Sequence, residues 1–249
     1  MLTSVRSLLA ATVLAGAALA ATPAMAQDDE ETPVVTITGN VSLVTDYRFR
    51  GIGLSGGDPA IQGGLTATTS PGIYVGAWAS SIDDGGTGFY GEMELDVFAG
   101  WAGEVTDGVG VDVGALYYLY PTNDFGPSDV IEFYAKVKPT IGPVALTLGI
   151  AYAPEQDSLA GFDNIYASAD AAIAIPDTPL TFTGHLGYTD GDFMTYTGDG
   201  TAFDWSVGAS VTVLGGLSIG VSYVGVESSD PRISGFDDDT VVGSLGFSF

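Results

Sequence analysis

Ionisable side chains recur at every second position in several segments of the sequence. Since a β-strand turns successive side chains to opposite faces, each such row lies on one face of a strand. Rows of opposite charge on facing strands form ion-pair ladders that rigidify an interior, or they line a constriction that selects ions. Both roles are compatible with one arrangement. The candidate residues are Asp46, Arg48, Arg50, Glu92, Glu94, Asp96, Asp112, Glu132, Lys136, Lys138, Asp170, His185 and Asp204.

Catalytic chemistry is disfavoured by the same residues. His185 is the single histidine, and a lone histidine on a strand is more often structural than catalytic. The sequence has no metal-ligand pattern, nucleotide-binding loop or ordered Ser/His/Asp set. Asp83-Asp84 and Asp237-Asp238-Asp239 offer oxygen ligands for Ca²⁺ or Mg²⁺ or a bridge to lipopolysaccharide, but solvated loop charges explain them as well. We therefore expect no enzyme and no cofactor.

Alternating apolar and polar residues predict about twelve strands. Most of these segments are close to the 9–11 residues that a tilted transmembrane β-strand needs. They are Val34–Ile52, Ala60–Thr69, Ile73–Ile82, Phe89–Glu104, Val109–Tyr120, Val130–Thr140, Val144–Ala153, Phe162–Ile175, Leu180–Thr189, Phe203–Leu214, Leu217–Val226 and Thr240–Phe249.

Short and long connections alternate along the chain. Tight turns rich in Gly and Pro, such as Thr106-Asp107-Gly108 and Ile141-Gly142-Pro143, alternate with longer acidic segments such as Pro121–Asp129 and Asp190–Ala202. This alternation is typical of outer-membrane barrels, where the turns are periplasmic and the long loops extracellular. A soluble β-sandwich would not require it. The pattern predicts an all-β, transmembrane antiparallel barrel of about twelve strands.

Both ends of the chain agree with export to the outer membrane. Residues 1–26 combine Arg6, an apolar stretch and an Ala24-Met25-Ala26 cleavage site, which together predict a signal peptide. Residues 27–33 form an acidic lead-in expected to be disordered, and 34–249 form the barrel. The chain closes on alternating Leu245, Phe247 and Phe249, a C-terminal pattern through which we expect the barrel-assembly machinery to recognise it.

Composition narrows the class of partner. The chain holds 31 acidic and 6 basic residues, a net charge of −25, so nucleic acid is excluded as a partner. Nevertheless 46% of the residues are hydrophobic. Apolar surface and charge are therefore separated, as in a membrane protein, and zero cysteines fit an exported chain without disulfides. We expect outer-membrane lipid and lipopolysaccharide around the barrel.

Parity assigns the faces of the strands. Met93, Leu95 and Val97 should face lipid, which turns Glu94 and Asp96 inward. By the same rule Tyr47 and Phe49 should face lipid, opposite the inward row of Asp46, Arg48 and Arg50, and these arginines are candidates to pair with the Glu92, Glu94 and Asp96 row. Both faces of Ile73–Ile82 are mixed, so its register stays open.

Several of these segments carry a family resemblance. Asp46-Tyr47-Arg48-Phe49-Arg50-Gly51, the stretch Gly72–Ser80, and Glu92-x-Glu94-x-Asp96 followed by Gly100-Trp101 together resemble the TorF family of bacterial porin-like proteins, catalogued as of unknown function. The resemblance implies an outer-membrane barrel with suspected pore activity. It implies no substrate.

The sequence thus predicts a passive outer-membrane channel for small solutes. Eight inward acids outnumber four inward Lys and Arg side chains, which favours cationic or neutral solutes. The alternative is a closed or nearly closed barrel with a structural, adhesive or sensing role through its acidic loops. Twelve strands lie between the filled eight-strand barrels and the open sixteen-strand channels, so the number of strands does not decide between these two.

Overall fold

The computed structural model describes residues 34–86, 89–124, 126–191, 200–227 and 236–249. The predicted signal peptide (1–26) and acidic lead-in (27–33) lie outside the described residues.

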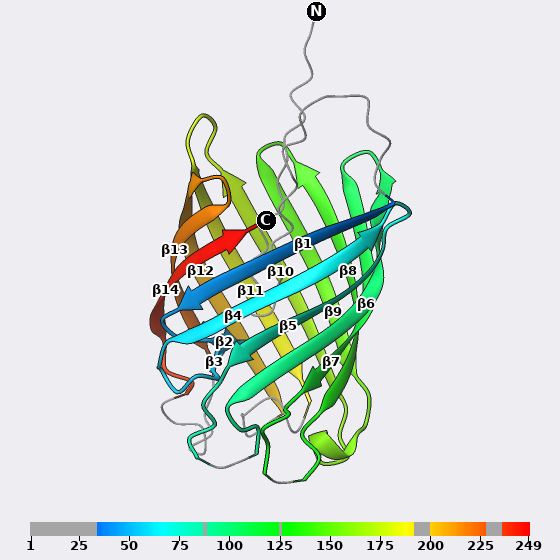
Figure 1. Cartoon of the computed structure of the whole chain (residues 1–249), viewed down its shortest axis with the longest axis vertical. Coiled ribbons are helices and arrows are strands. Elements are labelled where there is room, and N and C mark those ends of the chain that lie inside the picture. The colour runs from blue at the N-terminus through cyan, green and yellow to red at the C-terminus, as the bar shows by residue number, and fades with distance from the viewer. Residues whose placement is uncertain (1–33, 87–88, 125, 192–199, 228–235) are drawn as a thin grey trace, which may run out of the picture.

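Twelve long strands form a closed antiparallel barrel (Figure 1), which confirms the predicted fold class. In the described part of the chain, two short strands, β2 and β3, form a separate pair, and a short 3-10 helix, η1, lies between β9 and β10. The elements are β1 Val35–Val44, β2 Arg48–Phe49, β3 Ile52–Gly53, β4 Ala60–Thr69, β5 Ile73–Ser81, β6 Met93–Thr106, β7 Val109–Leu119, β8 Val130–Ile141, β9 Val144–Ala153, η1 Asp157–Leu159, β10 Asn164–Ala174, β11 Leu180–Asp190, β12 Thr201–Leu214, β13 Leu217–Val226 and β14 Thr240–Ser248.

The first and last strands close the barrel. β1 pairs antiparallel with β14 on one side and with β4 on the other. At the seam the Gly39 N–H donates to the Phe249 carbonyl at 2.9 Å, and the Phe249 N–H donates to the Gly39 carbonyl at 3.0 Å. Closure of this kind leaves no unpaired strand edge, which is the condition for a sheet to cross a lipid layer.

Deleting Phe249 should slow assembly of the barrel, because the seam loses both of these hydrogen bonds and its terminal aromatic ring. We expect a lower folded fraction, measured by heat-modifiability on gels of outer-membrane extracts. Phe249→Tyr is the matched control, since it keeps the backbone pair and an aromatic terminus and should assemble at wild-type yield. Wild-type yield of the deletion variant would contradict this role of the terminal strand.

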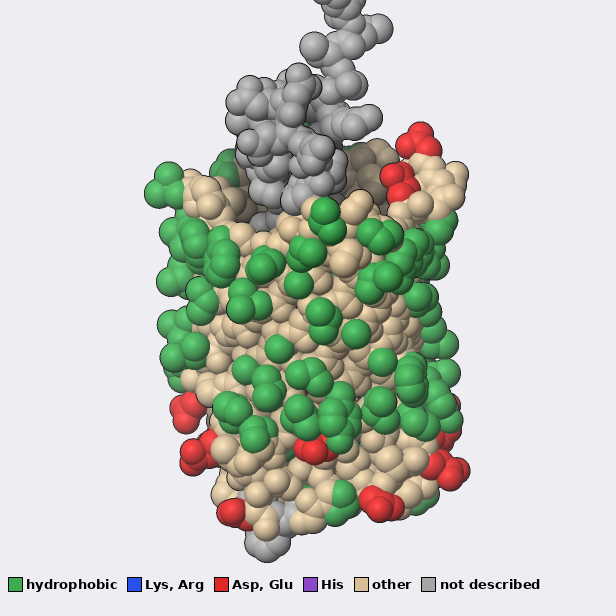
Figure 2. Space-filling model, turned by 45° about the vertical axis from the view of Figure 1, so that its right-hand side comes forward, with side chains coloured by type: hydrophobic (Ala, Val, Ile, Leu, Met, Phe, Trp, Pro, Cys, Tyr) green, Lys and Arg blue, Asp and Glu red, His purple; other side chains and the backbone are tan. Residues whose placement is uncertain are grey.

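The outer surface of the barrel is a belt of exposed apolar side chains. Leu186 is 66% exposed and Val207 57% exposed, both near the middle of their strands. In Figure 2 hydrophobic side chains cover the height of the barrel wall, and carboxylates gather near its two ends. No helix in the described part of the chain is long and apolar enough to cross a membrane.

The segment between β1 and β4 departs from the prediction. A single strand was predicted over Val34–Ile52, but β1 ends at Val44, and residues 45–59 fold back as an inner hairpin built on β2 and β3. Arg50 (φ 48°) and Gly51 (φ 82°) make its turn. Glycine is needed at 51, because a Cβ there would lie 2.5 Å from the Val226 Cβ.

Tyr47 and Phe49, predicted to face lipid, instead lie inside the barrel. Tyr47 is 2% exposed, and its ring meets Trp78 edge-on at 5.5 Å between centroids. Phe49 meets Tyr118 in the same way at 5.8 Å. Leu159 of η1 belongs to the same buried cluster. The lipid-facing assignment is wrong because both faces of the hairpin are buried, so alternation no longer separates lipid from lumen.

Candidate functional site

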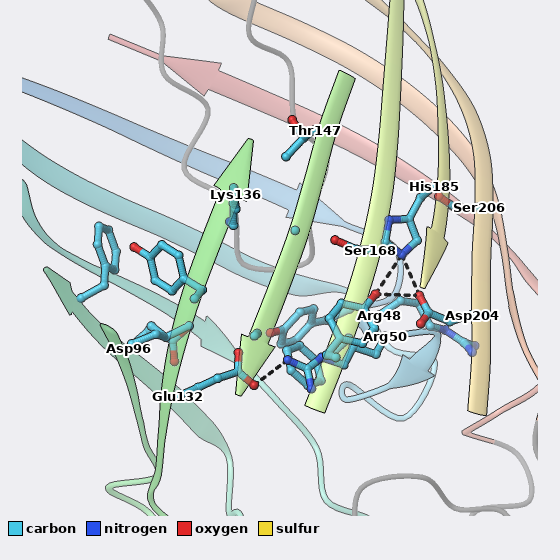
Figure 3. A pocket seen from close by; sticks show the side chains of 18 of the residues that line it. Arg48, Arg50, Asp96, Glu132, Lys136, Thr147, Ser168, His185, Asp204 and Ser206 are labelled. Carbon is cyan, nitrogen blue, oxygen red and sulfur yellow. Dashed lines mark hydrogen bonds and ion pairs between the residues drawn. The ribbon is translucent and has the colours of Figure 1, made fainter. Parts of the chain in front are cut away.

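The barrel encloses a cavity of about 490 Å³ whose walls are the inward side chains of the strands together with the inner hairpin. Neutral hydroxyl groups share this wall with charged groups, as seen for Thr147, Ser168 and Ser206 in Figure 3. The ionisable side chains that line the cavity are Asp46, Arg48, Arg50, Asp96, Asp112, Glu132, Lys136, Lys138, His185 and Asp204, with Tyr47, Tyr74, Tyr118, Tyr134 and Tyr166 beside them.

Three of the predicted residues have a different position. Glu94 and Asp170 are only 1% and 8% exposed; they point inward and contact Tyr47 and His185, but they are not among the residues that line the cavity. The prediction for Glu92 is wrong. β6 begins at Met93, so Glu92 belongs to the preceding turn and is exposed; its N–H donates to the Thr122 hydroxyl at 2.8 Å.

Arg50 connects the inner hairpin to the barrel wall. Its Nη2 donates to Glu132 Oε2 at 2.6 Å, and the Tyr118 hydroxyl donates to the other Glu132 oxygen at 3.3 Å. The guanidinium also lies over the Tyr166 ring, 4.1 Å from its centroid. Figure 3 shows this ion pair crossing from the hairpin to β8. Charge-assisted bonds between buried partners hold their geometry well, so the hairpin is fixed in the lumen.

Tyr47 makes a second connection. Its hydroxyl donates to Glu94 Oε1 at 2.7 Å, and Tyr120 donates to Glu94 Oε2 at 3.4 Å. Burial, the Glu94 carboxylate and the Asp96 carboxylate raise the pKa of the Tyr47 phenol well above its ordinary value. Tyr47 therefore keeps its proton and remains a donor to the wall.

Arg48 forms hydrogen bonds within the hairpin and with the connection between β13 and β14. Its Nε donates to Asp46 Oδ2 at 2.5 Å, while Nη1 donates to the carbonyls of Phe236 and Asp238 at 3.1 and 2.9 Å. The pairing of Arg48 and Arg50 with Glu94 and Asp96, considered from sequence, is not what the structure shows. The turn at Arg50 and Gly51 directs the two side chains to Asp46 and Glu132 instead.

His185 joins three strands. Its Nδ1 lies 2.7 Å from Asp170 Oδ1 on β10, and its Nε2 lies 2.8 Å from Asp204 Oδ1 on β12. The Tyr166 hydroxyl lies 3.0 Å from the same Nε2. Both ring nitrogens are therefore engaged with the wall, which is the geometry of a cross-strand clamp rather than of a free general base.

A further polar network lies toward the end of the barrel with the short turns. Asp112 Oδ2 accepts from Lys138 Nζ at 2.8 Å, and Oδ1 accepts from the Tyr74 hydroxyl at 2.6 Å. Tyr74 also contacts the Tyr134 hydroxyl, and Lys136 Nζ lies 5.0 Å from the centroid of the Tyr134 ring. Within the described ranges no group of three or more His, Cys, Asp or Glu is arranged to hold a metal ion.

Sequence reasoning missed most of these tyrosines. Tyr74 lies on β5, whose register was left open, and Tyr47 was assigned to the lipid side. In the structure Trp78 and Ser80 of β5 pair with Asp96 and Glu94 of β6. Tyr74 lies on the same face of β5 as Trp78 and Ser80, so this register turns Tyr74 inward.

A closed antiparallel barrel with an apolar outside and a lumen rich in charged and hydroxyl groups is the architecture of transmembrane β-barrel proteins. The chain belongs to the family described as a bacterial protein of unknown function (Gcw_chp), which matches residues 28–249. The resemblance to the TorF family stays a prediction, because the matching family description does not carry that name. No curated protein matches the chain.

Solved structures share this fold. The NanC porin aligns with a TM-score of 0.57 at 12% identity, covering 86% of this chain and 99% of NanC. The KdgM porin, solved in complex with disordered oligogalacturonate, aligns with a TM-score of 0.54 at 8% identity, covering 87% of this chain and 98% of KdgM. The COG4313 outer membrane channel from Pseudomonas putida F1 gives 0.52 at 11% identity, covering 91% and 99%. At these identities the likeness concerns the fold.

Proposed function

We propose that the protein is an outer-membrane channel for passive diffusion of small solutes, with the inner hairpin as its constriction. The observation that carries this proposal is the cavity inside the barrel, whose lining includes many charged and hydroxyl side chains beside its apolar ones. A polar lumen is characteristic of barrels that hold a water-filled path. The porin and channel structures that share the fold support the same function and location.

We further propose that the channel prefers cations. Without Glu92, seven inward carboxylates still face four inward Lys and Arg side chains. Outside the inner hairpin, the described residues of the long connections include Asp and Glu but no Lys or Arg. A narrow, low-dielectric entrance focuses such a field and enriches cations at the mouth. This end of the barrel would be extracellular, and the short turns periplasmic.

The reversal potential in a KCl gradient tests this preference. The wild-type channel should give a reversal potential of the sign expected for a cation-selective pore. The triple variant Asp124→Asn, Glu155→Gln, Asp238→Asn removes exposed carboxylates from three different long connections. It should therefore move the reversal potential toward zero. Asp107→Asn with Asp177→Asn is the control at the opposite end and should have a smaller effect. Anion preference in the wild type would contradict the proposal.

The alternative is a nearly closed barrel with a structural, adhesive or sensing role. One observation favours it, because the inner hairpin is folded into the barrel near the long connections (Figure 1) and its Tyr47 ring belongs to a buried aromatic cluster. The same planar-bilayer preparation separates the two functions, since a closed barrel would give no current.

A further inference from the structure

Lys136 differs from the other inward cations in its partners. Arg48, Arg50 and Lys138 each form an ion pair with an inward carboxylate, at 2.5, 2.6 and 2.8 Å. Among the described residues Lys136 has no carboxylate within salt-bridge distance, and its recorded contact is with the Tyr134 ring. Asp112 stands directly opposite Lys136 in the strand register, but Lys138 and Tyr74 occupy its two oxygens.

The wall beside Lys136 brings a serine hydroxyl close to the lysine stem across a glycine. Lys136 on β8 and Ser168 on β10 both lie in register with Gly149 on β9. A Cβ at Gly149 would lie 2.9 Å from Ser168 Oγ and 3.6 Å from Lys136 Cγ. Gly149, which has no side chain, therefore allows the Ser168 hydroxyl and the Lys136 stem to come close to each other across β9.

Further hydroxyl groups line the same cavity. Thr147 lies on β9 and Ser206 on β12, and both line the same cavity as Lys136 and Ser168 (Figure 3). Ammonium and hydroxyl groups are hydrogen-bond donors that suit a carboxylate, and hydroxyl groups also accept from the hydroxyls of a solute. The cavity volume of about 490 Å³ fits an organic molecule rather than a simple halide ion.

We propose that Lys136, Ser168 and Thr147 form a lumenal site for the carboxylate of a small hydroxylated organic acid. The proposal rests on the proposed channel function, to which it adds a solute class. The acidic mouth and Lys136 act in series: the mouth sets the preference among small ions, and Lys136 provides one position at which a single carboxylate is stabilised during passage.

Gluconate is a suitable probe, with sorbitol as the neutral polyol of similar size. Gluconate should reduce the KCl current of the wild-type channel at concentrations at which sorbitol does not. Lys136→Gln should raise the half-blocking gluconate concentration about tenfold or more, the change expected from losing one good charged contact. Ser168→Ala should raise it by a smaller factor. The reversal potential of Lys136→Gln should also move toward stronger cation preference.

Lys138→Gln is the matched control, because it removes the same formal charge from the same strand but from an ion pair with Asp112. We expect Lys138→Gln to change ion selectivity. Its half-blocking gluconate concentration should stay within about threefold of wild type, well below the tenfold change expected for Lys136→Gln. Equal loss of block in both variants would show that general lumen charge, and not this site, holds gluconate. Unchanged block in Lys136→Gln would also overturn the site.

Calorimetric titration of gluconate into the detergent-solubilised barrel separates this proposal from the channel itself. Binding that requires Lys136 in a protein that carries no current would support the site and refute the channel. Current through a protein that binds gluconate no better than sorbitol would support the channel and refute the site.

Discussion

Excising the inner hairpin should raise the single-channel conductance at least about twofold, because it removes the side chains that narrow the lumen. We expect the barrel to fold without the hairpin, because Val44 of β1 pairs directly with Ala60 of β4 and a two-residue Asn-Gly turn can join paired antiparallel strands in place of residues 45–59. Conductance of the purified variant in planar bilayers, compared with wild type in the same salt, measures the effect.

Arg50→Met is the matched smaller change. It removes the ion pair with Glu132 while the Tyr47 to Glu94 hydrogen bond remains, so the hairpin loses one of its two wall connections. We expect noisier current with a smaller rise in conductance than excision gives. If the excised barrel folds, as heat-modifiability would show, and conducts like wild type, then the hairpin is not the constriction.

Leu186→Arg should destabilise the barrel by roughly 2–4 kcal/mol, since arginine at the bilayer midplane is this costly on the lipid face of a barrel. Leu186 lies in the middle of β11 and is 66% exposed on the outer face, next to the inward His185. Urea unfolding of the barrel in lipid vesicles gives the free energy of unfolding.

Val105→Arg provides the depth control. Val105 is 58% exposed but lies one residue from the end of β6, where an arginine side chain reaches the interface and should cost only about 0–1 kcal/mol. Equal losses at both positions would show that depth in the membrane has been misassigned. A larger loss at Val105 would argue against the apolar belt as the lipid contact.

The barrel itself was predictable because each of its strands must alternate lipid-facing and lumen-facing side chains. Glu94 and Asp96 alternate with Leu95 and Val97, and a closed barrel needs one apolar and one polar face on each strand. The structure confirms a closed antiparallel barrel of this kind. The Ala60–Thr69, Val144–Ala153 and Leu217–Val226 segments have the bounds of β4, β9 and β13.

The inner hairpin was not predictable in the same way. Tyr47, Phe49, Arg48 and Arg50 alternate as a membrane strand does, but the Arg50 and Gly51 turn folds them into the lumen, where apolar and charged faces are both buried. The alternation of residue types does not indicate whether this segment continues the strand or folds into the lumen. That outcome depends on contacts with Trp78, Tyr118 and Glu132, which lie far along the chain. Glu92 failed for a simpler reason, since the strand begins one residue after it.

Single-channel recording of the purified wild-type protein in planar bilayers is the most direct test of the channel function. We expect discrete, reproducible current steps in KCl, and larger steps from the hairpin-excised barrel under the same conditions. A folded wild-type barrel that gives no steps at all would contradict the channel and leave the closed, loop-presenting barrel as the function to pursue.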